Sequence, residues 1–260
     1  MIPPTSIDGT DITGATIDGT DVEEITVDGD VVFTSAPPAI PSGAVAHYQF
    51  EDNTNTSTAT DSVGSNDGTI TGATYETGKV GSFALEFTGG SQYVDLGDTN
   101  FFENTDFTAA FWLNLNTIPT NANKYYTLAP GYDDITHPPH IFYDNNNLTN
   151  SEGIAIRSFD GNNVDFINSN VSHSVGSWVH VAISLDNSNG SVNIWIDNSK
   201  EVNGATLNNL TTNNQDYYIG AYNAGYGTDE EGLGGLMDDV VVYDRILTDT
   251  EIDRLYQRGQ

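Results

Sequence analysis

Carboxylates are the side chains of this chain with the most obvious chemical potential. It has 37 Asp and Glu residues against 7 Lys and Arg, a net charge of −30 at pH 7. Carboxylates bind hard cations such as calcium, or act as catalytic acids and bases when two are held rigidly together. The run Asp229-Glu230-Glu231 lies in a Gly-rich segment that would not hold carboxylates rigidly. Neither Gly-x-Ser-x-Gly nor His-Glu-x-x-His occurs, and there is no cysteine. We therefore expect a protein that binds and is not an enzyme.

Aromatic and polar side chains are mixed in two segments, residues 124–140 and 222–229, which we interpret as long irregular loops. An aromatic platform beside carboxylates and amides is suited to sugar binding, and loops often carry function on rigid β scaffolds. The predicted glycan-binding residues are Tyr126, Tyr132, Asp133, Asp134, His137, Tyr222, Tyr226 and Asp229. Packing or subunit contact is the alternative role for these rings. A zinc site at His137 and His140 would need ligands that the sequence does not supply.

The charge and hydropathy of the chain exclude some partners. Nucleic acid needs Lys and Arg to displace its counterions, and anionic membrane surfaces repel an acidic chain, so we expect neither as a partner. No run approaches the ~18 apolar residues of a membrane span, and Met1 to Ser6 lack the features of a secretory signal. The shortage of Lys extends along the whole chain. This favours a surface adapted to high salt over a local cation site.

The first 33 residues contain a repeat of about ten residues. Its units are Ile7–Ile12, Ile17–Val22 and Val27–Val32, each with an Asp-Gly turn signal and β-branched neighbours. Such short units do not close a core alone, so we expect them to be ordered by packing against other chains. A flexible acidic tail is the alternative. Three prolines in residues 34–43 predict an extended linker, which leaves residues 44–260 as the main domain.

Predicted strands and turns alternate through residues 44–260. The strands are expected at 44–50, 82–87, 92–96, 107–115, 178–185, 191–196 and 236–243. Most place apolar residues on one face, whereas 107–115 is aromatic-rich and continuous, as in a central strand buried on both faces. Near the end, Thr248 and Glu251 have capping-box spacing, and Ile252, Leu255 and Tyr256 form one helical stripe that Gly259 can end. The pattern predicts an all-β antiparallel sandwich with a short C-terminal helix, preceded by a small β-repeat segment.

The order of these pieces resembles the laminin-G-like, or concanavalin A-like lectin/glucanase, jelly-roll domains. The matching pieces are Val45–Asp52, Asp61–Thr69, Gly81–Phe87, Tyr93–Gly97, Phe107–Trp112, Trp178–Ala182, Ile194–Asn198, Gly235–Tyr243 and Leu247–Ile252. Asp197-Asn198 stands where the family usually has Asp-Gly, and Asn also tolerates a left-handed turn. The resemblance covers the chain from Ala44 to its end and implies a jelly-roll fold.

The resemblance also implies a metal. The family often carries calcium, and the sandwich should bring the first strand near the last. This gives Asp52, Asp61, Asp67, Asp238 and Asp239 as candidate ligands of a structural calcium ion. Chance clustering in an Asp-rich chain is the alternative. Glucanases of this fold use paired carboxylates on a central strand, and the Glu-x-Asp-x-x-Glu spacing is missing here.

The N-terminal repeat resembles the attachment regions of tailed-virus structural proteins. We therefore expect a virion structural protein of a halophilic tailed virus, such as a capsid turret, decoration or tail-fibre subunit. Residues 1–33 would bind other virion proteins, and the lectin-like domain would face host-surface glycans from the surface of the particle. A homo-oligomer is expected, with a trimer as the guess. The alternatives are a cell-surface or secreted carbohydrate-binding adhesin and a glycoside hydrolase of the concanavalin-like fold.

Overall fold

The computed structural model describes residues 16–17, 20–21, 24–27, 30–34, 37–52, 56–89, 92–97, 101–102, 105–119, 124–131, 137–145, 151–211, 215–222 and 232–260. The chain divides into two units, Met1–Pro38 and Ala39–Gln260. The division falls inside the segment that the prolines predict as a linker.

Two short antiparallel pairs form the described part of the first unit. β1 (Thr16–Ile17) pairs with β2 (Thr20–Asp21), and β3 (Glu24–Val27) pairs with β4 (Asp30–Thr34). Ile17 is opposite Thr20, and Val27 is opposite Asp30. Each pair thus encloses one Asp-Gly of the repeat, the spacing of a two-residue hairpin.

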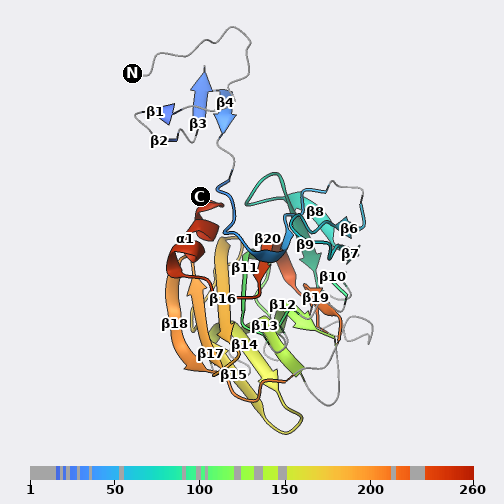
Figure 1. Ribbon diagram of the computed structural model, residues 1–260. Coiled ribbons are helices and arrows are strands. Elements are labelled where there is room, and N and C mark those ends of the chain that lie inside the picture. The colour runs from blue at the N-terminus through green and yellow to red at the C-terminus, as the bar shows by residue number, and fades with distance from the viewer. Residues whose placement is uncertain are drawn as a thin grey trace. The chain divides into compact units, whose positions relative to one another are not determined.

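The second unit consists of two antiparallel sheets, packed face to face as predicted (Figure 1). We call the first the β12 sheet. Its strand order is β15 (Val164–Asn168), β14 (Glu152–Phe159), β13 (His137–Asn145), β12 (Lys124–Pro130), β19 (Tyr217–Ile219), β10 (Tyr93–Asp95), β7 (Gly68–Thr71) and β6 (Thr58–Ala59).

We call the second the β20 sheet. Its order is β18 (Ser199–Thr206), β17 (Ser191–Ile196), β16 (Trp178–Asp186), β11 (Phe107–Leu115), β20 (Gly234–Tyr243), β9 (Phe83–Thr88) and β8 (Thr74–Thr77), and β5 (Ala44–Tyr48) also pairs with β20. The β5–β20 pairing brings the two ends of the unit together.

The core lies between the sheets because apolar side chains alternate toward it along the strands. Phe111 and Leu113 of β11 contribute to it with Val181 and Ile183 of β16 and Val242 of β20, all buried. The seven strands predicted from the sequence are confirmed, with ends that shift by two residues or fewer. Together they confirm the all-β sandwich, which is consistent with a jelly-roll.

The prediction that residues 124–140 form an irregular loop is wrong. Most of this segment belongs to β12 and β13, which pair with each other in the sheet. Pro138 and Pro139 suggest a loop because proline cannot donate to a ladder. Here the register of β13 against β14 shifts between His137 and His140, so the two prolines lie at a bulge where the ladder is interrupted.

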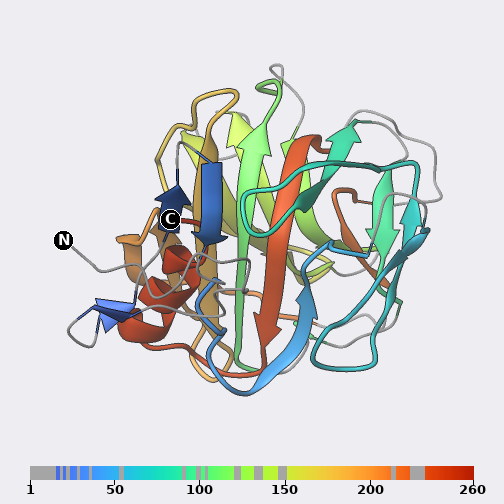
Figure 2. The ribbon, with the colours of Figure 1, turned by 90° about the horizontal axis from the view of Figure 1, so that it is seen from above.

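The C-terminal helix α1 (Asp249–Gln257) lies on the outer face of the β20 sheet, beside β16 to β18 (Figures 1 and 2). The predicted capping box is present: the Glu251 backbone N–H donates to the Thr248 hydroxyl, and the Thr248 N–H donates to the Glu251 carboxylate. Ile252 and Leu255 are buried against Trp195 of β17. In the described part of the chain, no helix has the length and apolar character needed to cross a membrane.

Residues 40–43 of the predicted linker contact this same side of the sandwich. Ile40 packs beside α1, the Tyr243 hydroxyl donates to the Pro41 carbonyl at 2.9 Å, and Arg245 donates to the Ser42 carbonyl at 2.9 Å. These contacts fix the start of β5 next to the end of β20.

Candidate functional site

Four rings form a cluster on the outer face of the β12 sheet. Tyr126 stacks on Tyr222, with ring centroids 4.6 Å apart and planes at 23°. His140 lies 5.5 Å from Tyr126 and 5.6 Å from Tyr222, and Phe142 lies 5.6 Å from Tyr126. Buried Ala129 and Ala155 complete an apolar patch that is separate from the core between the sheets.

The strand pairing explains how these rings meet. Phe142 is opposite Tyr126, and His140 lies two residues before Phe142, on the same face of β13. β19 runs antiparallel to β12, with Ile219 opposite Leu128, so the residues after β19 reach the start of β12 and place Tyr222 over Tyr126. Tyr126 is 1% exposed, whereas Tyr222 is only partly buried.

The structure brings together Tyr126 and Tyr222 of the predicted glycan-binding set. His137 is the first residue of β13. Tyr132, Asp133, Asp134, Tyr226 and Asp229 lie outside the described residues. Pro130 is opposite Tyr217 at the start of β19, whereas Tyr222 follows the end of β19. His140 is a member of the cluster that the sequence did not assign to it; its spacing from Phe142 was the available signal.

The predicted calcium ligands form two groups. In the first, the Asp61 carboxylate accepts backbone N–H groups from His47, Gly64, Asn66 and Val63 at 3.0 to 3.2 Å. The Asp61 N–H donates to Asp67, and the Thr60 N–H donates to Asp52, each at 2.9 Å. These carboxylates therefore tie loop backbone together.

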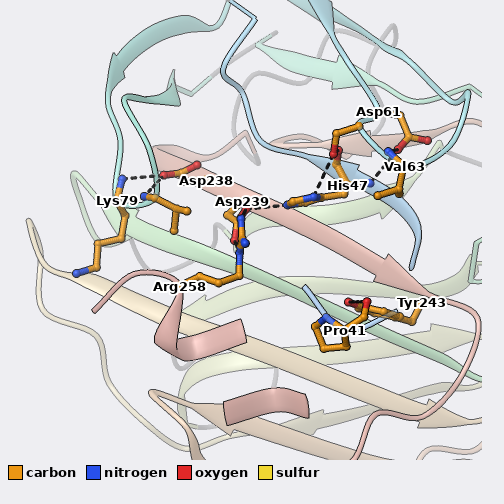
Figure 3. A network of polar contacts seen from close by, with 11 residues as sticks. Pro41, His47, Asp61, Val63, Lys79, Asp238, Asp239, Tyr243 and Arg258 are labelled. Atoms are coloured by element: carbon orange, nitrogen blue, oxygen red, sulfur yellow. Dashed lines mark hydrogen bonds and ion pairs between the residues drawn. The ribbon is translucent and has the colours of Figure 1, made fainter. Parts of the chain in front are cut away.

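The second group lies on β20, where Asp239 forms a buried ionic network (Figure 3). Arg258 donates from Nε to Asp239 Oδ2 at 2.6 Å and from Nη2 to Oδ1 at 2.8 Å, and His47 Nε2 lies 2.7 Å from Oδ1. Burial alone would raise the pKa of Asp239, but the hydrogen bonds from Arg258 and His47 outweigh it and lower this pKa to about 2. Asp239 is thus ionised and joins β5, β20 and the residue that caps α1.

Asp238, the adjacent residue, has a different environment. Its Oδ2 accepts the N–H groups of Lys79 and Val80 at 2.7 and 2.8 Å. Burial raises the pKa of this carboxyl to about 7, and the charge of Asp239 adds to the increase, although the two N–H groups oppose it. Adjacent carboxyls with pKa values pushed apart are a pattern found in acid–base catalysis. Here both residues are buried, with 0% and 4% exposure, so no substrate reaches them in this conformation.

These contacts do not fit a single calcium site made from all five residues. Among the residues that the structure describes, no group of three or more His, Cys, Asp or Glu side chains is arranged to hold a metal ion. Oxygens of Asp61 and Asp238 that calcium would need instead accept backbone N–H groups, and both oxygens of Asp239 are hydrogen-bonded to Arg258 or His47. Calcium binding stays a prediction, which melting curves with and without a chelator would test.

His47 contacts both Ser62 and Asp239, the same order as in a Ser-His-Asp catalytic triad. The Ser62 Oγ lies 3.1 Å from His47 Nδ1, but it also donates to the His47 carbonyl at 3.0 Å. The N–H groups of Val63 and Gly64, which follow Ser62, both donate to Asp61 and are not available to stabilise an oxyanion. We interpret this arrangement as structural.

Comparison with known proteins identifies the same fold. The family model described as "Concanavalin A-like lectin/glucanases superfamily" matches residues 88–253. No curated protein sequence matches the chain.

Several solved structures share the fold. Domain 4 of AbnA, a GH43 extracellular arabinanase from Geobacillus stearothermophilus, in complex with arabinotriose, is 22% identical, with a TM-score of 0.61; the match covers 83% of this chain and all of that one. Trypanosoma rangeli sialidase in complex with sialic acid is 17% identical, with a TM-score of 0.61, and the match covers 90% of this chain but 35% of the sialidase chain. The binding domain of Paraclostridial Mosquitocidal Protein 1 is 18% identical, with a TM-score of 0.60, over 82% of this chain and 52% of that chain.

These neighbours correct the prediction that the chain is not an enzyme. The fold occurs in chains of an arabinanase and a sialidase as well as in a binding domain. At these low identities the likeness shows the fold alone, and this fold is compatible with an enzyme as well as a binding domain.

Proposed function

We propose that this chain, which belongs to the concanavalin A-like lectin/glucanases superfamily, binds carbohydrate through the outer face of its β12 sheet. The observation that carries the proposal is the stacked pair of Tyr126 and Tyr222. Tyr126 is buried in the sheet face and stacks on Tyr222, which is only partly buried. A ring held in this way is preorganised, so little conformational entropy is lost when a sugar packs on it.

A stacked aromatic pair is suited to a sugar ligand. A sugar presents apolar C–H groups to an aromatic ring and hydroxyl groups to its sides, and sites for such ligands combine aromatic side chains with a few polar groups. The arabinanase domain that matches over its full length is bound to arabinotriose. Arabinotriose is therefore the first probe, followed by an array of neutral and charged oligosaccharides.

The test compares Tyr222→Ala with Tyr93→Ala. Tyr93 lies in β10 of the same sheet, where it contacts Tyr218 edge-on, outside the Tyr126 cluster. We expect Tyr222→Ala to weaken oligosaccharide binding at least about tenfold, a loss of about 1.4 kcal/mol, and Tyr93→Ala to leave it unchanged. Calorimetric titration measures both. Equal binding by Tyr222→Ala and the parent protein would reject this site, and release of new reducing ends would support hydrolysis.

We further propose that the module is displayed on a larger particle, such as the virion of a halophilic tailed virus, with residues 1–33 as its attachment. The separate N-terminal unit and its repeated hairpin spacing support this proposal. Mass measurement of the full chain in high salt tests for the expected homo-oligomer, with a trimer as the first expectation. Deletion of residues 1–33 should then yield monomers that still bind oligosaccharide. A full chain that stays monomeric would favour the adhesin alternative.

A further inference from the structure

A polar pocket lies on the other sheet. Its volume is about 350 Å³, and it opens where the β17–β18 turn meets the first turns of α1. It is lined by Trp195, Asn198, Lys200, Asp249, Thr250 and Asp253. Because these residues belong to the β20 sheet and its helix, the pocket is distinct from the Tyr126 cluster on the β12 sheet.

An aromatic ring covered by a lysine forms one wall. The Lys200 ammonium lies 4.7 Å from the centroid of the Trp195 ring and 2.6 Å from Asp249 Oδ1. Trp195 is only 2% exposed, whereas the Asp249 side chain is 72% exposed. An ion pair to such an exposed carboxylate contributes little stability, and the lysine stem is flexible. Lys200 can therefore move off the ring at the cost of this weak ion pair and of its cation–π contact with Trp195.

Hydrogen-bond donors and acceptors surround this ring. The Asn198 amide donates to Asp253 Oδ1 at 2.7 Å, which connects the turn to α1. Asp197 and Asn198 both have positive φ values, 47° and 65°, so the turn has a defined left-handed geometry that holds the amide in place. The carboxylates accept hydrogen bonds, the Asn198 amide donates them, and the Thr250 hydroxyl does both.

The charge balance selects among ligands. Two carboxylates against one ammonium, in a chain of net charge −30, disfavour an anion. An added cation would compete with the Lys200 ammonium, and a purely apolar ligand would leave most of the polar lining unpaired. A neutral sugar offers a C–H face for Trp195 and hydroxyls for the surrounding groups, and the volume is at the small end of ligand sites.

We propose that this pocket binds one neutral monosaccharide unit of a glycan, with its ring over Trp195 after Lys200 has moved aside. The inference deepens the proposed carbohydrate-binding function and rests on it for the class of ligand. It adds a second contact point, on the opposite sheet, so one module would hold two glycan chains at once.

The experiment uses the full chain on an array of neutral and charged oligosaccharides that includes arabinotriose, followed by calorimetric titration. Asn198→Gly removes the amide and keeps the left-handed turn, because glycine accepts positive φ. Asp249→Asn removes the charge of one pocket carboxylate. Asp244→Asn, exposed and outside the pocket, is the matched control for the change in charge. Melting temperatures confirm that each variant is folded.

We expect Asn198→Gly and Asp249→Asn each to weaken binding of at least one neutral oligosaccharide about tenfold, and Asp244→Asn to leave it unchanged. Lys200→Ala should keep or strengthen this binding, because it uncovers Trp195; loss of binding in Lys200→Ala would overturn the assignment of a neutral ligand. If no oligosaccharide depends on Asn198 and Asp249, the pocket proposal is rejected. Binding that is lost in Tyr222→Ala alone supports only the Tyr126 cluster, and binding lost only in the pocket variants supports only the pocket.

Discussion

At the scale of single residues, Asp239 is the buried charge on which others depend. Replacing it with Asn leaves the guanidinium of Arg258, which is 7% exposed, without its carboxylate. Breaking a buried pair in this way costs about 3–5 kcal/mol. Urea unfolding at pH 7 should show a loss of this size for Asp239→Asn and almost none for Glu201→Gln, an exposed acid on β18. A loss below about 1 kcal/mol would contradict the structural role of the network.

The lowered pKa of Asp239 also predicts that the folded chain loses stability in acid. The pKa of Asp239 is lowered to about 2 in the folded chain, against an ordinary value near 3.8. The stability that it contributes is therefore fully present above about pH 4 and is lost as the pH falls toward 2. Burial also lowers the pKa of His180 to about 4, so this residue adds a loss of stability between about pH 6.5 and 4. The difference in stability between the parent and Asp239→Asn should shrink only between about pH 4 and 2, where Asp239 titrates.

Asp238 predicts the opposite dependence of stability on pH. Its pKa is raised to about 7, so ionising it costs stability as the pH rises from about 4 to 7. Within the described part of the chain, its Oδ1 has no hydrogen-bond partner. Asp238→Asn keeps an acceptor for the Lys79 and Val80 N–H groups and removes the charge. We expect a net gain on the order of 1 kcal/mol at pH 8 and little change at pH 4, measured by urea unfolding. A loss of stability at pH 8 would contradict the raised pKa, because it would mean that the negative charge of Asp238 stabilises the fold.

At the scale of elements, α1 depends on its first turn. Thr248 accepts the Glu251 N–H and closes the capping box, so Thr248→Ala should lower the free energy of unfolding by about 1 kcal/mol. Thr248→Ser keeps the hydroxyl and is the control. Because α1 carries Asp249 and Thr250, the alanine variant should also weaken the pocket beside Trp195. Equal stability of the two variants would mean that packing of Ile252 and Leu255 alone fixes the helix.

The elements also show how far the sequence determines the structure. β11 is predicted to the residue because the aromatic-rich run 107–115 begins and ends at an apolar residue with a polar neighbour outside it. β12 and β13 are missed because Pro138 and Pro139 favour a loop, and only the bulge against β14 makes them compatible with a strand. Tyr126 and Tyr222 are found from composition, but their stacking depends on the pairing of β12 with β19, which local patterns do not show. The ionic network is missed for the same reason, since His47, Asp239 and Arg258 meet only through tertiary contacts.

At the scale of the whole molecule, the net charge of −30 should govern stability in salt. Unlike the buried Asp239 network, exposed carboxylates interact through solvent, where the screening length falls from about 10 Å at 0.1 M salt to about 3 Å at 1 M. Screening reduces their mutual repulsion in the folded chain, so the melting temperature should rise by several degrees between these concentrations, in both NaCl and KCl. Sucrose at matched osmolarity is the control, because it stabilises by exclusion and does not screen charge. If sucrose raises the melting temperature as much as salt does, repulsion among the carboxylates is not what limits the stability of the fold.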